Sequence, residues 1–194
     1  MKLENEITVL VKCSYEELKK ILESNDFLQK QEYVVNDIYM INNQVDLKNT
    51  KKLDILSKCI LVRDVVGFEK TLTYKYKKYS DNNDIIEQGK VKCPILDIKK
   101  AVEFMKMIDY KKLFEIHDTC IVFANKETEL VVQLVNDKYI FIEMEDKCEF
   151  VDKVYKDVNE MKNDLLSYNL PIDTSNFFIK KALIMLNEII KGGK

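Results

Sequence analysis

Two pairs of glutamates stand near the two ends of the region that carries strand-like patterns. Glu4 and Glu6 open it, and Glu143 and Glu145 close it. Alternate residues of a strand share a face, so each pair would present two carboxylates on one side with apolar residues behind. One such pair would be an ordinary solvated face. Glutamate is a poor strand residue, however, so two pairs inside hydrophobic strands favour a site for Mg²⁺ or Mn²⁺, which prefer hard oxygen ligands.

Cationic side chains show the same alternation. They form the predicted phosphate-binding set of Arg63, Lys75, Lys90 and Lys92, in which Arg63 is the only arginine among 31 basic residues. A planar guanidinium can bind phosphate in a bidentate fashion, which a lysine cannot. Asp37 and Tyr39 share a face of another strand, and Tyr39 is interpreted first as a packing residue. An interior lined by both charge signs could hold a polyanion together with divalent cations.

Composition removes several other function classes. The net charge of −2 over 194 residues argues against a nucleic-acid or anionic-membrane binder. Only four glycines are present, two of them at the C-terminal end, so neither a Walker loop nor a Rossmann fingerprint can exist. The single histidine, His117, stands at the end of a predicted strand and is interpreted as a turn or partly exposed residue rather than a catalytic base. Five scattered cysteines without a Cys-x-x-Cys motif indicate a reducing compartment.

The periodicities predict an α+β protein. Alternating patterns predict strands at 4–12, 33–41, 58–66, 69–79, 84–93, 112–117, 119–124, 129–135 and 139–146. Helices are expected after Ser14, where Ser14 and Glu17 form a capping box, and after Asp97. Two more are expected at about 154–167 and 174–191, the latter with an apolar face to bury against the body or a partner chain. The lysine-rich stretch 42–57 is predicted to be a surface loop.

The order of these elements suggests an internal repeat. A strand, a helix and a group of strands occur twice, which favours one antiparallel sheet or barrel built from two halves. We therefore expect a single domain over 1–194, with a first half at 1–89, a second half at 90–146 and a C-terminal helical extension at 147–194. No signal peptide or membrane-spanning run is recognisable, so a soluble cytoplasmic protein is expected.

Several short motifs together resemble the CYTH superfamily, the triphosphate tunnel metalloenzymes. They are Glu4-Asn5-Glu6, Asp37-Ile38-Tyr39, Ile60-Leu61-Val62-Arg63, Leu72-Thr73-Tyr74-Lys75 and Phe141-Ile142-Glu143-Met144-Glu145. The resemblance spans roughly 4–146. It implies an eight-stranded antiparallel tunnel with flanking helices, in which acidic residues bind Mg²⁺ or Mn²⁺ and basic residues hold a triphosphate.

This chain departs from the family pattern at five positions. Neutral Thr8 and Leu61 stand where the family has a lysine and an arginine. In the second half, Asp118 and Cys120 occupy the positions of another basic pair, and Gln133 replaces an aspartate of the metal site. The carboxylates are therefore kept better than the cations.

Three functions are compatible with this set of residues. The first is divalent-metal-dependent hydrolysis of inorganic tripolyphosphate or of an organic triphosphate. The second is a degenerate, non-catalytic member that binds a phosphorylated or anionic ligand. The third is class IV adenylyl cyclase chemistry, for which no adenine-binding residues are recognisable. The expected partner is a triphosphate-bearing small molecule, with neither nucleic acid nor membrane involved, and the apolar C-terminal helix leaves a homodimer open.

Overall fold

A computed structural model describes residues 6–79 and 85–192, without the side chains of 75–79, 85–88 and 192. Its strands are β1 (Glu6–Leu10), β2 (Leu28–Asn42), β3 (Ile60–Val65), β4 (Glu69–Tyr79), β5 (Ile85–Pro94), β6 (Tyr110–Ala124), β7 (Glu129–Val135) and β8 (Tyr139–Glu145). Its helices are α1 (Tyr15–Ser24), α2 (Lys52–Ser57), α3 (Ile98–Met107), α4 (Val158–Ser167) and α5 (Lys181–Gly192).

The eight strands form one sheet in the order β1-β8-β7-β6-β2-β3-β4-β5. The pairings described along it are antiparallel, which confirms the α+β class and the eight-stranded sheet. The sheet order also places β1 of the expected first half beside β8 of the second, while β5 beside β4 spans the expected boundary between 89 and 90. Closure into a tunnel stays a prediction.

The chain divides into two compact units. Unit 1 contains Val35–His117 and Lys181–Lys194, and unit 2 contains Lys2–Val34 and Asp118–Lys180. The long strands β2 and β6 contribute to both units. The division into halves at 1–89 and 90–146 concerns the repeat and stays a prediction.

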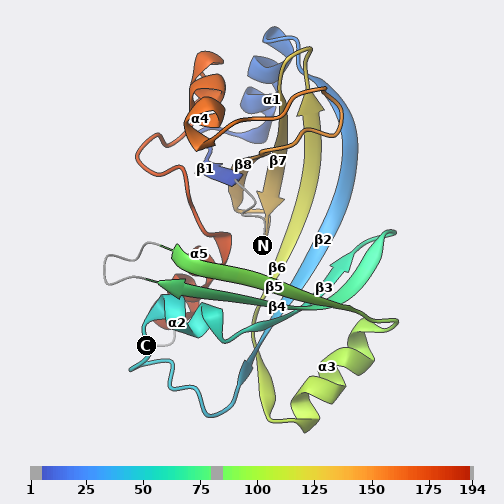
Figure 1. Ribbon diagram of the computed structural model, residues 1–194, viewed down its shortest axis with the longest axis vertical. Helices are drawn as coiled ribbons and strands as arrows, with labels where there is room; N and C mark the ends of the chain where they lie inside the picture. The colour runs from blue at the N-terminus through green and yellow to red at the C-terminus, as the bar shows by residue number, and fades with distance from the viewer. Residues whose placement is uncertain (1–5, 80–84, 193–194) are drawn as a thin grey trace. The chain divides into compact units, whose positions relative to one another are not determined.

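The core of unit 2 lies between the sheet and two helices, α1 and α4 (Figure 1). On the sheet side, Ile7 and Val9 of β1 and Ile142 of β8 are fully buried. On the helix side, α1 contributes Leu18 and Leu22, while α4 contributes Met161 and Leu165. Helical spacing places each of these pairs on one face of its helix, which explains why both helices pack flat on the sheet.

Side-chain caps fix where both of these helices begin. Ser14 accepts a hydrogen bond from the Glu17 amide, and the Glu17 carboxylate accepts one from the Ser14 amide, which confirms the predicted capping box. Asp157 caps α4 by accepting from the amides of Asn159 and Glu160. The helix expected at 154–167 therefore starts at Val158, because Asp157 is the first residue with a capping side chain.

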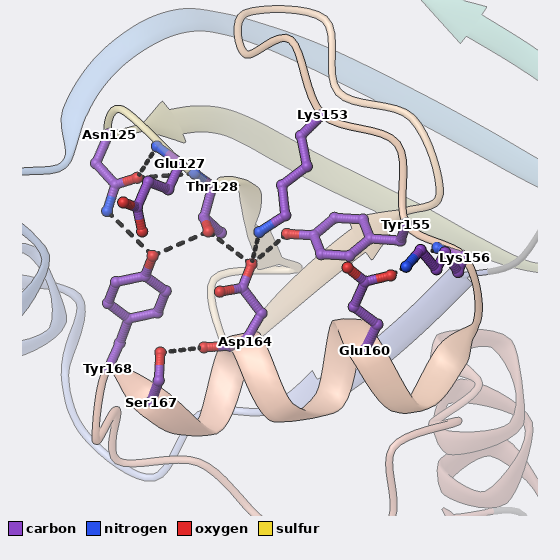
Figure 2. Close-up of polar contacts among 10 residues, drawn as sticks. All are labelled: Asn125, Glu127, Thr128, Lys153, Tyr155, Lys156, Glu160, Asp164, Ser167 and Tyr168. Atoms are coloured by element: carbon purple, nitrogen blue, oxygen red, sulfur yellow. Dashed lines mark hydrogen bonds and ion pairs between the residues drawn. The ribbon is translucent and has the colours of Figure 1, made fainter.

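A polar network fastens α4 to the turn between β6 and β7 (Figure 2). Oδ2 of Asp164 accepts hydrogen bonds from Thr128 Oγ1 at 2.6 Å, Lys153 Nζ at 2.6 Å and Tyr155 Oη at 2.5 Å. Tyr168 Oη donates to Thr128 Oγ1 at 2.9 Å and closes the network from the end of α4. Three donors on one carboxylate oxygen hold the helix in a single orientation over the sheet.

Unit 1 has its own, smaller core. Met40 of β2 and Val62 of β3 are fully buried beneath Ala101 and Met105 of α3. The predicted Asp97 cap of α3 is present, accepting from the Lys100 amide at 3.0 Å.

Three local expectations differ from the structure. Helix α5 begins at Lys181 instead of 174, because the preceding segment pairs with β1. The stretch 42–57 is not a loop throughout, since Lys52–Ser57 forms α2 and buries Ile55. The strands expected at 112–117 and 119–124 are one continuous strand, β6.

Helix α5 buries part of its apolar face within unit 1, where Leu186 is fully buried and Met185 nearly so. Among the described residues, none of the helices has the length and apolarity to cross a membrane.

Candidate functional site

The carboxylates of unit 2 are brought together by the pairing of β1 with β8. The register sets Glu6 opposite Glu145 and Thr8 opposite Glu143. Directly opposed residues share a face of the sheet, so these four residues lie on one side. The alternate residues, including Ile7 and Met144, are buried on the other side, in the core beneath α1 and α4. We call the face of Glu6, Thr8, Glu143, Glu145, Gln133 and Asp118 the acidic face.

The acidic face continues across β7 and β6. Val131 of β7 lies opposite Glu143 of β8, and Gln133, two residues along β7, lies opposite Cys120 of β6. These residues therefore lie on the same side of the sheet, and the face extends over four strands. Gln133 is 4% exposed, and its Oε1 atom has no hydrogen-bond partner in the part of the chain that the structure describes. A buried acceptor without a donor costs free energy, which makes this oxygen a position where a ligand or cation would be stabilised.

Tyr33 of β2 is a neighbour of this face that sequence reasoning missed. Burial raises the pKa of its phenol above the ordinary value, and a hydrogen bond with Cys120 and the negative charges of Glu143 and Asp118 raise it further. The phenol therefore stays protonated. The only signal in the sequence is that Tyr33 lies an even number of residues before Asp37 and so shares its face of the strand. Tyrosine itself gives no reason to select this residue, because the sequence has ten.

The acidic face has the donor type that a hard divalent cation requires. Like charges directly opposite each other, such as those of Glu6 and Glu145, repel, and a bound cation would relieve that repulsion. The available donors are carboxylate oxygens and the Gln133 carboxamide oxygen, which suit Mg²⁺ or Mn²⁺. Among the described side chains, no three from Asp, Glu, His and Cys converge as a metal-binding group. Glu4, the fourth predicted ligand, lies outside the described residues.

The predicted phosphate-binding arginine lies in unit 1 and is bound by a neighbouring carboxylate. Asp37 and Arg63 are directly opposed in the pairing of β2 with β3. Arg63 donates from Nε to Oδ1 and from Nη2 to Oδ2 of Asp37, both at 2.6 Å. The Asp37 side chain is 8% exposed and that of Arg63 25%. The planar fork is thus used, at least on two of its donors, for an internal ion pair.

The lysines of β5 lie on the same face as Arg63. Thr71, Thr73 and Lys75 are alternate residues of β4 and therefore share a face. Thr71 lies opposite Arg63 of β3, and Thr73 and Lys75 lie opposite Lys92 and Lys90 of β5. Lys92 forms an ion pair with Glu69 at 2.8 Å, and both side chains are more than a third exposed. The side chain of Lys75 lies outside the described residues. We call the face of Asp37, Arg63, Lys90 and Lys92 the basic face.

Tyr39 and His117 occupy the positions expected of packing and surface residues. Tyr39 stacks on Phe114 with ring centroids 4.4 Å apart. Burial raises the pKa of Tyr39, as does the charge of Asp37, while Arg63 opposes the change. His117 is exposed and lies within strand β6, with Nδ1 2.7 Å from Asn36 Oδ1.

Comparisons with solved structures agree on the fold. PH1819 from Pyrococcus horikoshii superposes with a TM-score of 0.61 at 17% identity, over 96% of this chain and 99% of that one. HpAC1 from Hippeastrum, a candidate adenylyl cyclase with a dominant triphosphatase activity, gives 0.59 at 12% identity, over 99% and 97%. A candidate adenylate cyclase from Vibrio parahaemolyticus gives 0.56 at 10% identity, over 95% and 98%.

These likenesses show that the fold is shared with those structures over nearly the whole chain. No family profile matches the sequence, and no curated protein sequence matches it either.

Proposed function

We propose that this protein binds a triphosphate-bearing small molecule and hydrolyses it with Mg²⁺ or Mn²⁺. Glu6, Glu143 and Glu145 hold the cation, together with Glu4. Arg63, Lys75, Lys90 and Lys92 bind the phosphate oxygens. The observation that carries the proposal is the β1–β8 register, which opposes Glu6 and Glu145 on the face turned away from the core.

Hydrolysis of a triphosphate requires positioned groups and compensating charge, and it does not require a nucleophile from the protein. Water attacks the terminal phosphorus, the bridging P–O bond breaks, and orthophosphate leaves the shortened polyphosphate. When bound, the cation would neutralise part of the negative charge of the phosphates. The carboxylates position the cation, and the cationic side chains stabilise the negative charge on the transferred group.

Two further observations support the proposal, the first for the cation and the second for the substrate. The Oε1 atom of Gln133 is a buried acceptor on the acidic face, on strand β7, which pairs with the strand that bears Glu143. HpAC1, which shares the fold over nearly the whole chain, has a dominant triphosphatase activity.

Binding without turnover is the second candidate, and the basic face favours it. Asp37 already neutralises Arg63, and Glu69 already neutralises Lys92. Thr8, Leu61 and Gln133 are neutral where the family has charged residues. A site with these losses would still attract an anion but would stabilise the transition state less.

The experiment measures phosphate release and binding on the same protein. Tripolyphosphate is incubated with Mg²⁺, with Mn²⁺ and with excess chelator, and orthophosphate is followed by colorimetry. We expect cation-dependent release that the Glu143→Gln/Glu145→Gln variant lacks. The matched control, Glu115→Gln, changes an exposed strand glutamate of unit 1 that pairs with Lys112.

Calorimetric titration with tripolyphosphate separates the two candidates. Heat of binding without phosphate release would establish the non-catalytic alternative, and no heat and no release would refute both. ATP with a cyclic AMP readout tests the cyclase alternative. Cyclic AMP formed faster than phosphate would overturn hydrolysis as the main activity.

A further inference from the structure

Lys162 of α4 holds its ammonium group over two phenyl rings. Its Nζ atom lies 4.8 Å from the ring centroid of Phe178 and 5.3 Å from that of Phe177. Phe177 packs against the core of unit 2, whereas Phe178 is 52% exposed. Cation–π contacts restrict the lysine without neutralising its charge.

The segment that carries these rings is hydrogen-bonded to strand β1. The Thr8 amide donates to the Phe177 carbonyl at 2.9 Å, and the Ile179 amide donates to the Thr8 carbonyl at 3.1 Å. This parallel bridge sets Phe178 level with Thr8, whose partner on the other side is Glu143. Two strand spacings, about 10 Å, therefore separate the backbones of Phe178 and Glu143.

Lys162 differs from the cations of the basic face in its counter-charge. Arg63 and Lys92 each have a carboxylate within 4.0 Å, whereas no carboxylate among the described residues lies that close to Lys162. The lysine is also only partly exposed. A positive charge held in place and left without a carboxylate is suited to an anionic ligand.

The position of this lysine is fixed from the opposite side of α4. Asp164, two residues further along, is bound by Thr128, Lys153 and Tyr155 (Figure 2). Residues two apart on a helix point in nearly opposite directions, so the Asp164 network sets the direction in which Lys162 leaves α4.

We propose that Lys162 binds a phosphate oxygen of the ligand at the β1 edge of the acidic face. Phe178, which is level with Thr8 in the parallel bridge, is a positioning residue for the ammonium group. This inference rests on the proposed function and adds a binding residue to it: α4 supplies at this edge the positive charge that the neutral side chain of Thr8 does not.

The test is calorimetric titration of tripolyphosphate into the full chain with Mg²⁺ present, together with the KM for phosphate release. Lys162→Met keeps the apolar stem and removes the charge, so the fold is retained and the thermal midpoint should not move. We expect the dissociation constant and KM to rise about tenfold, the usual size for one lost charged hydrogen bond. Lys162→Arg should restore most of the affinity.

Two further variants make the result specific. Lys156→Met removes an exposed lysine of the same unit, just before α4, and should change neither quantity. Phe178→Leu should weaken binding about threefold through loss of the cation–π contact, and Phe178→Tyr should not.

Wild-type affinity in Lys162→Met, with turnover still dependent on Glu143, would overturn the inference and leave the proposed function intact. Absence of both binding and phosphate release in the wild-type protein would overturn the two together. An equal loss in Lys162→Met and Lys156→Met would reduce the effect to net charge and would also overturn the inference.

Discussion

The acidic face of unit 2 and the basic face of unit 1 handle their charges in opposite ways. On the acidic face, the register opposes one carboxylate to another, Glu6 to Glu145. On the basic face, the same kind of register opposes a carboxylate to a guanidinium, Asp37 to Arg63, in a bidentate ion pair. Like charges directly opposite repel, whereas the bidentate ion pair leaves neither of its charges uncompensated.

The proposed function asks different things of the two faces. On the acidic face, a cation between Glu6 and Glu145 would relieve the repulsion of like charges. On the basic face, phosphate oxygens would have to replace the carboxylates that bind Arg63 and Lys92. The two faces should therefore respond differently to substitution.

The largest expected effect is that of Glu143→Gln on the acidic face. Loss of one carboxylate should lower cation-dependent phosphate release about a hundredfold or more, the scale for one preorganised electrostatic group. The thermal midpoint of the variant is measured beside that of the wild type, so that a loss of turnover is separated from a loss of the fold. Wild-type turnover in this variant would show that the acidic face takes no part in the reaction.

The next effect concerns stability and belongs to the basic face. Asp37→Asn leaves the partly buried guanidinium of Arg63 without its charge partner and should lower the free energy of unfolding by about 2–3 kcal/mol. Urea denaturation measures this loss. The double variant Asp37→Asn/Arg63→Met should recover part of it, because no uncompensated charge remains. Additive losses in the double variant would mean that the two side chains are not coupled.

The sequence predicted the elements better than the contacts between them. The bounds of β4 at 69–79 and of β7 at 129–135 follow from alternation alone, and the capping box fixes the start of α1. Helix α5 was expected too early because Thr174 or Ser175 can cap a helix and Phe178 fits the spacing of its apolar face. Phe178 instead pairs with the edge of β1, a long-range interaction that no local pattern encodes.

The same limit applies to the candidate site. Strand parity indicated which side chains share a face, and so grouped Glu143 with Glu145 and Asp37 with Tyr39. It could not indicate that Asp37 lies opposite Arg63, because register depends on which strands become neighbours. Lys162 carries no signal at all in the sequence, being one lysine among many on a helix.

A third, intermediate effect uses pH on the Asp164 network of unit 2. Burial raises the pKa of Asp164, but hydrogen bonds from Lys153, Thr128 and Tyr155 outweigh burial and lower it below the ordinary value. A lowered pKa in the folded state contributes stability above the unfolded-state pKa, about 3.9. That stability is lost as the pH falls through the folded-state pKa.

Acid denaturation of Asp164→Asn tests this. The variant should be less stable than the wild type at pH 7, and the difference should shrink as the pH falls below about 4. Asp152→Asn, which changes an exposed aspartate of the same unit, is the matched control. A difference that stays constant down to pH 2 would assign the loss to packing instead of charge.

The smallest effect returns to the basic face and asks whether its internal pairs compete with a ligand. The hydrogen bond from Lys92 and its charge lower the pKa of Glu69, so this carboxylate is ionised at neutral pH and neutralises Lys92. An exposed pair of this kind contributes at most about 1 kcal/mol, so Glu69→Gln should barely change stability.

Releasing Lys92 should tighten tripolyphosphate binding about two- to threefold at low salt, and the gain should fade at high salt. The same titration on Glu103→Gln, an acidic change on α3 of the same unit, controls for net charge. Weaker binding in Glu69→Gln would mean that Glu69 positions Lys92 for the ligand instead of competing with the ligand for Lys92. The charges of the basic face would then be arranged for a ligand, as those of the acidic face are proposed to be.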